Sequence, residues 1–455
     1  MPRAFPLGLV FISAACAVQA TPTSQEDVRL VPIGAAWAQT SVNAAIFRRS
    51  SVVTRGNTQF VAFYDPDARL MLARRTLGTP DWEIYRTPYT GGVRDAHNAI
   101  SLAVDGEGVL HIAWDHHGQP LRYARGRRPG SLELMNPMPM TGRLESAVTY
   151  PEFYLLPDGD LLFLYRDGSS GSGNVLLNRY HIAAREWRPV QHPLIDGEGQ
   201  RNAYVNRIVI DAHGRWHISW TWRETPDVAT NHDVLYAVSD DEGKTWRTSA
   251  GERYTLPITA ANGEVASPVA QGSELINQTS MAADTAGRPL IATYWRPPGT
   301  DVPQIHLVWN DGNGWRTSQA GNRTLAFRLS GSGTKRIPLS RPLVLAGDGA
   351  IYIVYRDEER GGAVSVAETR SANRNDWRVF DLHTGDVGMW EPTHDPELWE
   401  HHRCLHLFHL RVGQGDGETV EDMPPQTASI LEWRAETRPT ADSCITESPE
   451  VTGHE

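Results

Sequence analysis

The chain repeats one short apolar run seven times, and this repeat restricts the fold more than any other feature. Most copies end in an aromatic residue followed by a polar one, and successive copies begin about fifty to seventy residues apart. A turn precedes most copies, and a further strand-like stretch and a Trp follow them. The seven copies are Phe60–Asp65, Leu110–Asp115, Leu161–Arg166, Trp216–Thr221, Leu290–Trp295, Ile351–Arg356 and, more weakly, Cys404–His409.

This spacing is typical of four-stranded repeat units, and the sequence between the copies has no helical periodicity. The pattern therefore predicts an all-β chain. Seven such units arranged radially form a seven-bladed β-propeller of four-stranded antiparallel blades, which protects its sheet edges by closing into a ring. We expect the region Val28–Arg49 to complete that ring together with the last blade.

One turn sharpens the fold prediction. The segment from Ser239 to Trp246 reads SDDEGKTW and fits the pattern S-x-D-x-G-x-T-W. It resembles the Asp-box, a hairpin turn of sialidase-type propellers in which the Ser and Asp tie the turn and the Trp packs between blades. This motif indicates the propeller fold but says little about the function of the protein.

The two ends of the chain differ from its middle. Residues 1–20 contain Arg3, a long apolar run and a small residue at position 20, the pattern of a secretory signal peptide cleaved after Ala20. A lipoprotein anchor at Cys16 fits the sequence less well. We expect an exported protein whose residues 21–435 form the propeller as one domain and whose polar residues 436–455 form a disordered tail.

The net charge and the apolar content of the chain limit the kinds of partner that we expect it to bind. The formal net charge is −11 at pH 7, which disfavours long-range attraction to nucleic acid or to an anionic membrane surface. No stretch after the signal is long and apolar enough to span a membrane. We expect a monomer with neither kind of partner. Cys404 and Cys444 remain after cleavage, and the sequence does not decide whether they pair.

Strand geometry gathers candidate functional residues. First strands begin, and second strands end, on the same face of a propeller. The hairpin that begins at His97 and ends in His116 and His117 should therefore group its histidines at one rim. Tyr150 lies eight residues before the turn residue Asp158, as His97 lies before Asp105. The same register predicts one face of three adjacent blades that carries His97, His117, Tyr150, Arg166, Tyr204, Trp222 and Arg223.

This set of side chains favours one reaction class. It contains imidazoles, phenols and arginine, but no pair of carboxylates in the same register. Most glycosidases need such a pair, and sialidases need a cluster of three arginines, which is not evident here. β-Elimination at a uronic acid instead needs a base for the C5 proton, a cation beside the resulting enolate and an acid for the leaving glycosidic oxygen.

At these residues the chain resembles the secreted propeller-type ulvan lyases. The resemblance spans most of the mature chain and is most specific over 94–206. It implies a seven-bladed propeller that cleaves ulvan, an anionic polysaccharide, between a 3-sulfated rhamnose and a uronate and leaves a 4,5-unsaturated uronate. The matching stretches are His97–Asn98, Trp114–His117, Tyr150–Phe153, Leu156–Gly159, Tyr165–Gly168, Ser172–Asn174, Asn202–Tyr204, Asn231–Asp233 and Asn277–Gln278.

The resemblance also implies roles for single residues. His97 and Tyr150 would be the acid/base pair, with either one as the base, and His117 and Arg166 would neutralise the uronate carboxylate. No cofactor is required for this chemistry. Some related lyases hold a structural metal, and His232 is the candidate ligand here for zinc or calcium. The residues expected to bind substrate are Tyr204, Asn98, Arg223 and Trp222.

Two other functions remain open at this point. The first is a propeller enzyme that releases terminal rhamnose from rhamnosyl-glucuronate side chains, which would need a pocket closed at one end. The second is a non-catalytic carbohydrate-binding propeller, which would tolerate the loss of His97 or Tyr150. Fold alone decides between none of these, because propellers host many functions. We rank the ulvan-type lyase first.

Overall fold

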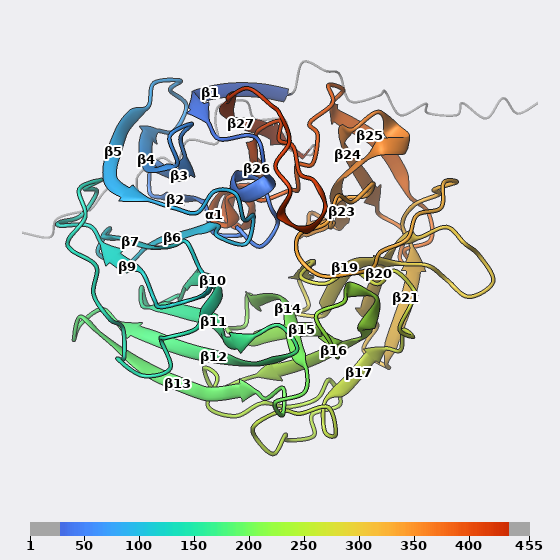
Figure 1. Ribbon diagram of the computed structural model, residues 1–455. Helices are drawn as coiled ribbons and strands as arrows, with labels where there is room; N and C mark the ends of the chain where they lie inside the picture. Colours follow the sequence, from blue (N-terminus) through green and yellow to red (C-terminus); the bar gives the residue numbers. More distant parts are fainter. Residues whose placement is uncertain (1–27, 436–455) are drawn as a thin grey trace, which may run out of the picture.

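Seven antiparallel sheets stand around a common axis (Figure 1). The computed structural model describes residues 28–435. Each of the seven repeated runs forms a strand in a different sheet, which confirms the seven-bladed β-propeller. The signal peptide predicted for residues 1–20, the tail predicted for residues 436–455 and Cys444 lie outside the described residues.

Four of the sheets have the four strands that the repeat predicts. In each of them the strands follow one another along the chain and pair with their sequence neighbours. These blades are β2 (Val52–Arg55), β3 (Thr58–Tyr64), β4 (Arg69–Thr76) and β5 (Glu83–Thr90); β14 (Asn202–Ile210), β15 (Trp216–Arg223), β16 (Asn231–Ser239) and β17 (Glu264–Ser267); β18 (Ser280–Ala283), β19 (Pro289–Trp295), β20 (Gln304–Asn310) and β21 (Trp315–Gln319); and β22 (Leu343–Gly347), β23 (Ala350–Asp357), β24 (Ala363–Thr369) and β25 (Arg378–His383).

The second blade has three strands, β6 (Ile100–Val104), β7 (Leu110–Trp114) and β9 (Tyr123–Arg125). A single bridge between Gly126 and Leu134 continues its outer edge. The chain beyond that bridge carries Pro137 and Pro139, which cannot donate to a ladder and so shorten the fourth strand.

The third blade has an additional strand. Its own strands are β10 (Val148–Leu155), β11 (Leu161–Ser169), β12 (Ser172–His181) and β13 (Glu186–Ile195). The short β8 (His117–Gln119) leaves the second blade and pairs with β10, which gives five strands. This crossing strand brings a residue of one blade into the inner edge of the next.

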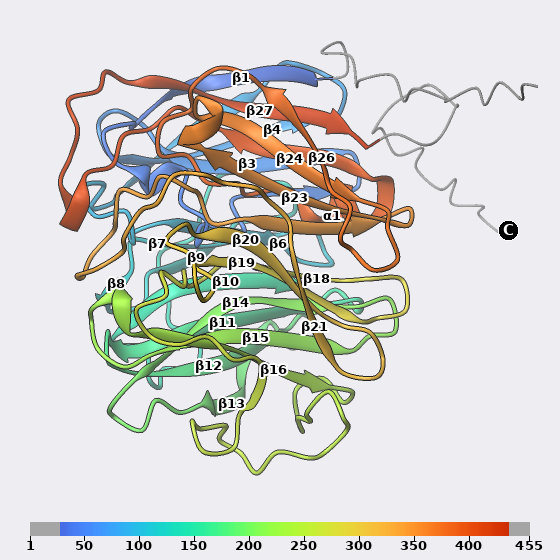
Figure 2. The same ribbon diagram turned by 90° about the vertical axis from the view of Figure 1, so that its right-hand side faces the viewer.

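The N-terminal strand closes the ring. β1 (Val28–Ala36) pairs antiparallel with β27 (Gln426–Arg434), which pairs with β26 (Cys404–His409). A bridge between His394 and Leu407 marks the inner edge of this last blade. Both views show β1 beside β27 (Figures 1 and 2). The predicted closure is confirmed, although the strand ends at Ala36 and the chain then continues through the 3-10 helix η2 (Ser41–Asn43).

The core lies between neighbouring blades. One cluster joins side chains of the third and fourth blades and includes Trp216, Trp220 and Trp246. Trp246 has no exposed surface, and its Nε1 donates to the carbonyl of Gly243 at 3.0 Å. Asp241 accepts from the Thr245 amide at 2.8 Å, as the Asp-box pattern predicts. The turn therefore fixes a tryptophan that seals one blade against another.

Helices are short in the described part of the chain. They are α1 (Pro396–His402) and the 3-10 turns η2, η3 (Val228–Thr230), η4 (Glu358–Arg360) and η5 (Asp416–Glu418). No helix among the described residues has the length and apolarity to cross a membrane. Cys404 is disulfide-bonded.

Candidate active site

The ladder of β8, β10 and β11 aligns the first members of the site. Thr149 pairs with His117 of β8 on one side and with Arg166 of β11 on the other. Its hydroxyl accepts from the amide of Gly118 at 2.8 Å and from Nη2 of Arg166 at 3.1 Å. Sheet register therefore places an imidazole and a guanidinium on either side of one buried threonine.

A break in this ladder redirects Tyr150. The pairing of β10 shifts between Thr149 and Glu152, and Tyr150 has φ = 53°, in the left-handed region. That conformation is strained for a large residue that precedes a proline, and such strain is concentrated at functional sites. The ring centroid of Tyr150 lies 5.8 Å from the ring centroid of His97 and 5.1 Å from Cζ of Arg166. The bulge thus puts the phenol close to both the histidine and the arginine.

One carboxylate holds both histidines. Oδ1 of Asp95 lies 2.6 Å from Nδ1 of His97, and Oδ2 lies 2.6 Å from Nδ1 of His117. The two imidazoles stack with centroids 4.0 Å apart. Because each Nδ1 faces Asp95, the Nε2 of each ring is the nitrogen left for a substrate.

A second carboxylate reaches His97 from the last blade. Oε1 of Glu418, in η5, lies 3.2 Å from Nδ1 of His97. Burial alone would lower the pKa of His97, but hydrogen bonds and charges from Asp95 and Glu418 outweigh it and raise that pKa to about 9. Burial would likewise raise the pKa of Glu418, yet the contact with His97 lowers it. His97 is therefore a cation at neutral pH.

Tyr204 has the opposite electrostatic environment. Its hydroxyl lies 3.0 Å from Oγ of Ser170 and accepts from Nη1 of Arg223 at 3.3 Å. Burial would raise the pKa of Tyr204, but the positive charges of Arg223 and Arg166 outweigh it and lower that pKa to about 7. The pKa of Tyr150, by contrast, is raised by burial and by the neighbouring Tyr204. Two phenols with centroids 6.1 Å apart thus favour different protonation states.

Arg223 is fixed in place beside Tyr204. Its Nε donates to Oδ1 of Asn231 and its Nη2 to Oδ1 of Asn277, both at 2.8 Å. The guanidinium carbon lies 4.4 Å from the Tyr204 ring centroid. A cation held by neutral amides keeps its full charge for the phenol and for a substrate.

Three residues of the sequence analysis lie apart from this cluster. Trp222 is 2% exposed and packs against Trp220 in the core, because alternation along β15 turns it away from the face that Arg223 occupies. The side-chain amide of Asn98 donates to the carbonyl of Gly92 at 2.9 Å. His116 is fully buried and accepts from the Arg122 amide at 2.8 Å.

His232 does not fit a metal site. Its Nε2 lies 2.9 Å from Oε1 of Glu224, and its Nδ1 lies 2.9 Å from Oδ2 of Asp233. Both nitrogens are thus engaged by carboxylates, and these raise its pKa. Within residues 28–435, the group with metal-ligand spacing is instead Asp95, His97 and His117.

Three residues that contact His97 were not predicted from the sequence. Asp95 stands two residues before His97, and an Asp-x-His pair was the available signal. Phe47 stacks on His97 with centroids 5.5 Å apart, but it lies in an irregular segment that no motif marks. Glu418 lies more than three hundred residues from His97, and nothing in the local sequence connects the two.

The profile of a BNR repeat-containing family member matches residues 58–323, more than half of the chain. The chain belongs to the BNR repeat-containing family. Among curated relatives, the short-isoform ulvan lyase of Alteromonas sp. (strain LOR) is 31% identical over 139 residues, 26% of this chain and 25% of that protein. The long-isoform ulvan lyase of Alteromonas sp. is 26% identical over 218 residues, 36% of this chain and 22% of that protein. This BNR-repeat propeller thus spans about a quarter of the length of these relatives.

Solved structures share the fold of the BNR-repeat propeller. Polysaccharide lyase Uly1 is 18% identical, with a TM-score of 0.60 over 85% of this chain and 89% of that one. A PL25 ulvan lyase bound to -[GlcA(1-4)Rha3S]- is 15% identical, with a TM-score of 0.63 over 85% of this chain and 97% of that one. At these identities the likeness establishes the propeller architecture alone.

The cluster in this BNR-repeat propeller combines the parts of an acid/base site. It holds a protonated imidazole at His97, a phenol with a lowered pKa at Tyr204 and a guanidinium at Arg166, whose Cζ lies 5.1 Å from the Tyr150 ring and 6.0 Å from the Tyr204 ring. Oppositely shifted pKa values in adjacent groups are typical of acid/base pairs. The arrangement can therefore remove one proton and donate another around a bound anion.

Proposed function

We propose that this propeller is a polysaccharide lyase that cleaves an ulvan-type sulfated rhamnose–uronate polymer by β-elimination. The observation that carries the proposal is the convergence of His97, Tyr150, Arg166 and Tyr204 in one cluster beside Arg223. The partial sequence similarity to two ulvan lyases supports the choice of polymer.

The proposed reaction uses these groups in sequence. The Tyr204 phenolate takes the C5 proton of the uronate, and the electrons of that C–H bond form the C4–C5 double bond. The C4–O bond breaks, and His97 gives its proton to the departing rhamnose oxygen. Arg166 and His117 face the uronate carboxylate, whose negative charge grows in the enolate-like transition state.

This assignment departs from what the resemblance implies, because it makes Tyr204 the base and not only a substrate contact. The resemblance pairs His97 with Tyr150 and leaves the base open. Two carboxylates keep His97 protonated, so it suits the acid role. Two guanidiniums favour the phenolate form of Tyr204, whereas burial favours the neutral form of Tyr150. Tyr150 is then a neutral phenol that donates a hydrogen bond to the substrate or shares the proton delivered to the leaving oxygen.

The first experiment follows ultraviolet absorbance with ulvan, a rhamnogalacturonan and gum arabic as parallel substrates. The conjugated C4–C5 double bond absorbs, and a hydrolysis product does not. Rising absorbance on ulvan is the expected result. New reducing ends without absorbance would mean hydrolysis, and absorbance on gum arabic alone would favour release of terminal rhamnose. If none of the polymers gives a product, the remaining interpretation is a non-catalytic carbohydrate-binding propeller.

A second experiment separates the two tyrosines. With Tyr204 as base and His97 as acid, kcat/KM rises with pH through about 7 and falls again through about 9. Tyr204→Phe should abolish turnover, and Tyr150→Phe should reduce it strongly, with both folds intact by circular dichroism. Retained activity in Tyr204→Phe together with an inactive Tyr150→Phe would move the base role to Tyr150.

We also propose that the enzyme is secreted and monomeric and that its chemistry requires no metal. The pattern of residues 1–20 supports export. Light scattering on the purified protein, N-terminal sequencing of the mature form and activity after chelation test the three statements.

A further inference from the structure

An open pocket lies beside the histidines and takes no part in the chemistry above. It has a volume of about 590 Å³. Its walls come from the ends of β5 and β7, from the segment between β8 and β9 and from the chain beyond β9, and they include Pro88, Tyr89, Trp114, Asp115, Arg122 and Pro137. Aromatic and proline surfaces with a few placed polar groups are the usual lining of small-molecule sites.

Two glycines let the backbone form one wall. A Cβ on Gly91 would lie 2.5 Å from the Tyr64 ring, and one on Gly92 would lie 2.8 Å from Nδ2 of Asn98. The Gly92 amide donates to Oδ1 of Asp115 at 2.7 Å, and Asp115 has φ = 67°, a strained conformation for a non-glycine residue. The wall is thus built to a specific shape.

Arg122 and Tyr89 give the pocket its chemistry. Nη1 of Arg122 pairs with Oδ2 of Asp115, and the side chain is 43% exposed, so Asp115 orients a guanidinium whose other donors can reach a ligand. The half-buried Tyr89 ring packs on buried Trp114 with centroids 4.9 Å apart. A rigid aromatic ring can pack against the C–H face of a pyranose while the guanidinium binds an anionic substituent.

The pocket is close enough to the site to serve the same polymer. Gly92 stands three residues before Asp95, which holds both histidines, and three residues of chain span at most about 11 Å. Asp115 stands two residues before His117. A chain bound at the histidines can therefore extend into the pocket.

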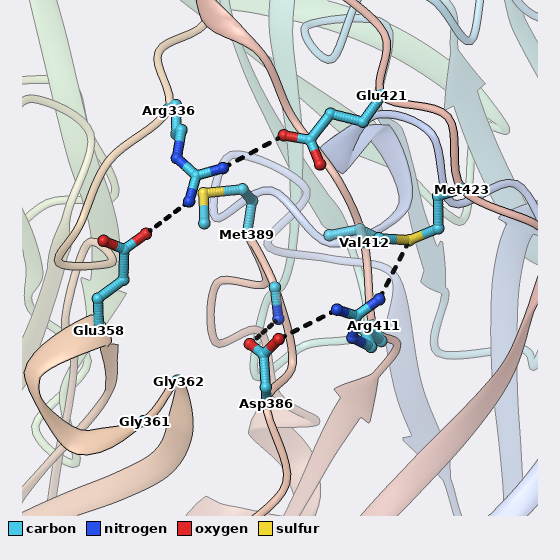
Figure 3. Close-up of a pocket in the computed structure, with 11 residues that line it drawn as sticks. Arg336, Glu358, Gly361, Gly362, Asp386, Met389, Arg411, Val412, Glu421 and Met423 are labelled. Carbon is cyan, nitrogen blue, oxygen red and sulfur yellow. Dashed lines mark hydrogen bonds and ion pairs between the residues drawn. The ribbon is translucent and has the colours of Figure 1, made fainter.

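A second cavity on the propeller lacks these features (Figure 3). It has a volume of about 380 Å³, and no aromatic ring lines it. Arg336 pairs with Glu358 and Glu421, and Arg411 pairs with Asp386. The cavity is lined by three carboxylates and only two guanidiniums. This excess of negative charge disfavours the binding of an anionic sugar.

We propose that the pocket around Tyr89 and Arg122 is a subsite for an anionic sugar residue of the polymer, one that carries a sulfate or a carboxylate. The inference rests on the proposed lyase function and adds to it a binding position away from the bond that is cleaved. Its occupation should lower KM for long substrates and leave the chemical step unchanged.

The test compares Arg122→Ala and Arg122→Gln with Arg128→Ala. Arg128 is an exposed arginine on the turn near Gly108, at the opposite end of the same blade, where Gly130 donates to the Gly108 carbonyl. We measure kcat and KM on long ulvan oligosaccharides and on the shortest cleavable one. A lost charge-assisted contact predicts that both Arg122 variants raise KM on long chains about tenfold. The values of kcat and of KM on the shortest substrate should stay within about twofold, and Arg128→Ala should resemble wild type.

Affinity electrophoresis through gels that contain ulvan or desulfated ulvan gives a readout that needs no turnover. Weaker retardation of Arg122→Gln than of Arg128→Ala in the ulvan gel supports the subsite. If the difference vanishes with desulfated polymer, the recognised group is a sulfate, and if it persists, the group is the carboxylate. Equal KM and equal retardation would overturn the inference. A wild type that forms no unsaturated product refutes the lyase instead, and the gel then still decides the subsite.

Discussion

Glu418 reaches His97 from the opposite end of the chain, and replacing it with glutamine removes a charge that helps keep the imidazole protonated, together with one acceptor for the amides of Ala96 and Thr334. The substitution keeps the size of the side chain and removes its charge. Because His97 is proposed to donate a proton, activity is lost as pH rises through its pKa. Glu418→Gln should therefore move the alkaline limb of the pH–rate profile to lower pH.

The distance between His97 and Glu418 sets the size of the expected change in the pKa of His97. Nδ1 of His97 and Oε1 of Glu418 are 3.2 Å apart. Coulomb's law at that distance gives about 1.3 kcal/mol in water and about 5 kcal/mol at an effective dielectric constant of 20. The Glu418 side chain is 25% exposed, so the lower part of this range applies. At 1.36 kcal/mol per unit, the pKa of His97 should fall by about one to two units from about 9.

The assay is kcat/KM on ulvan from pH 5 to 10. With the pKa of His97 at about 7 to 8, the protonated fraction at pH 8 falls from about nine-tenths to between about a half and a tenth. The rate at pH 8 should drop about two- to tenfold, and the rate at pH 6 should change little. Glu421→Gln is the matched control, because Glu421 lies on the same loop and contacts Arg336 at 3.5 Å.

Thermal stability provides an independent test of the effect of the Glu418 charge on His97. A histidine whose pKa is raised on folding stabilises the protein fully below its unfolded value of about 6.5, and this stabilisation is lost as pH rises through about 9. Glu418→Gln should therefore lower Tm more at pH 6 than at pH 10. An alkaline limb that stays near 9 in the variant would refute the idea that Glu418 holds the proton on His97.

Three further predictions test other parts of the molecule. Arg166→Ala should lower kcat about 10²- to 10³-fold, because the enolate loses its counter-charge; unchanged turnover, measured as unsaturated product, would remove Arg166 from the neutralising role. Asp241→Ala should reduce unfolding free energy by about 1–3 kcal/mol in thermal or urea denaturation and leave kcat unchanged below Tm, because the Asp-box turn loses its acceptor far from the site. Chelation should leave activity unchanged, and a loss that zinc or calcium restores would show that the chemistry depends on a metal, for which Asp95, His97 and His117 have the spacing of ligands.

Local sequence was enough to predict the architecture. The seven apolar runs, their turns and the Asp-box each depend on contacts within one blade, where partners lie a few residues apart. The closing segment could also be predicted within Val28–Arg49, because a ring of hairpins leaves one strand position open, but the end of the strand at Ala36 could not. The number of strands in the second and third blades could not be predicted, because β8 leaves one blade to pair with β10 of the next.

The residue types at the site followed from the periodicity of the strands. His97, His117, Tyr150, Arg166 and Tyr204 stand at strand ends that must share one face of a propeller, and the structure brings these five side chains together. Strand periodicity does not fix which side of a strand faces the site once a bulge shifts the register. Trp222 and Arg223 are consecutive in β15, so alternation lets only one of them face the site, and Trp222 lies in the core.

Only the tertiary structure decided the protonation states on which the chemistry depends. A pKa is set by burial and by charges within a few ångströms, and only the folded chain brings all of these charges together. Asp95 and, from the last blade, Glu418 raise the pKa of His97, and Arg223 and Arg166 lower that of Tyr204 from two different blades. The sequence determined the ring and the kinds of side chain on its face, whereas closure of the ring determined which of them hold a proton at neutral pH.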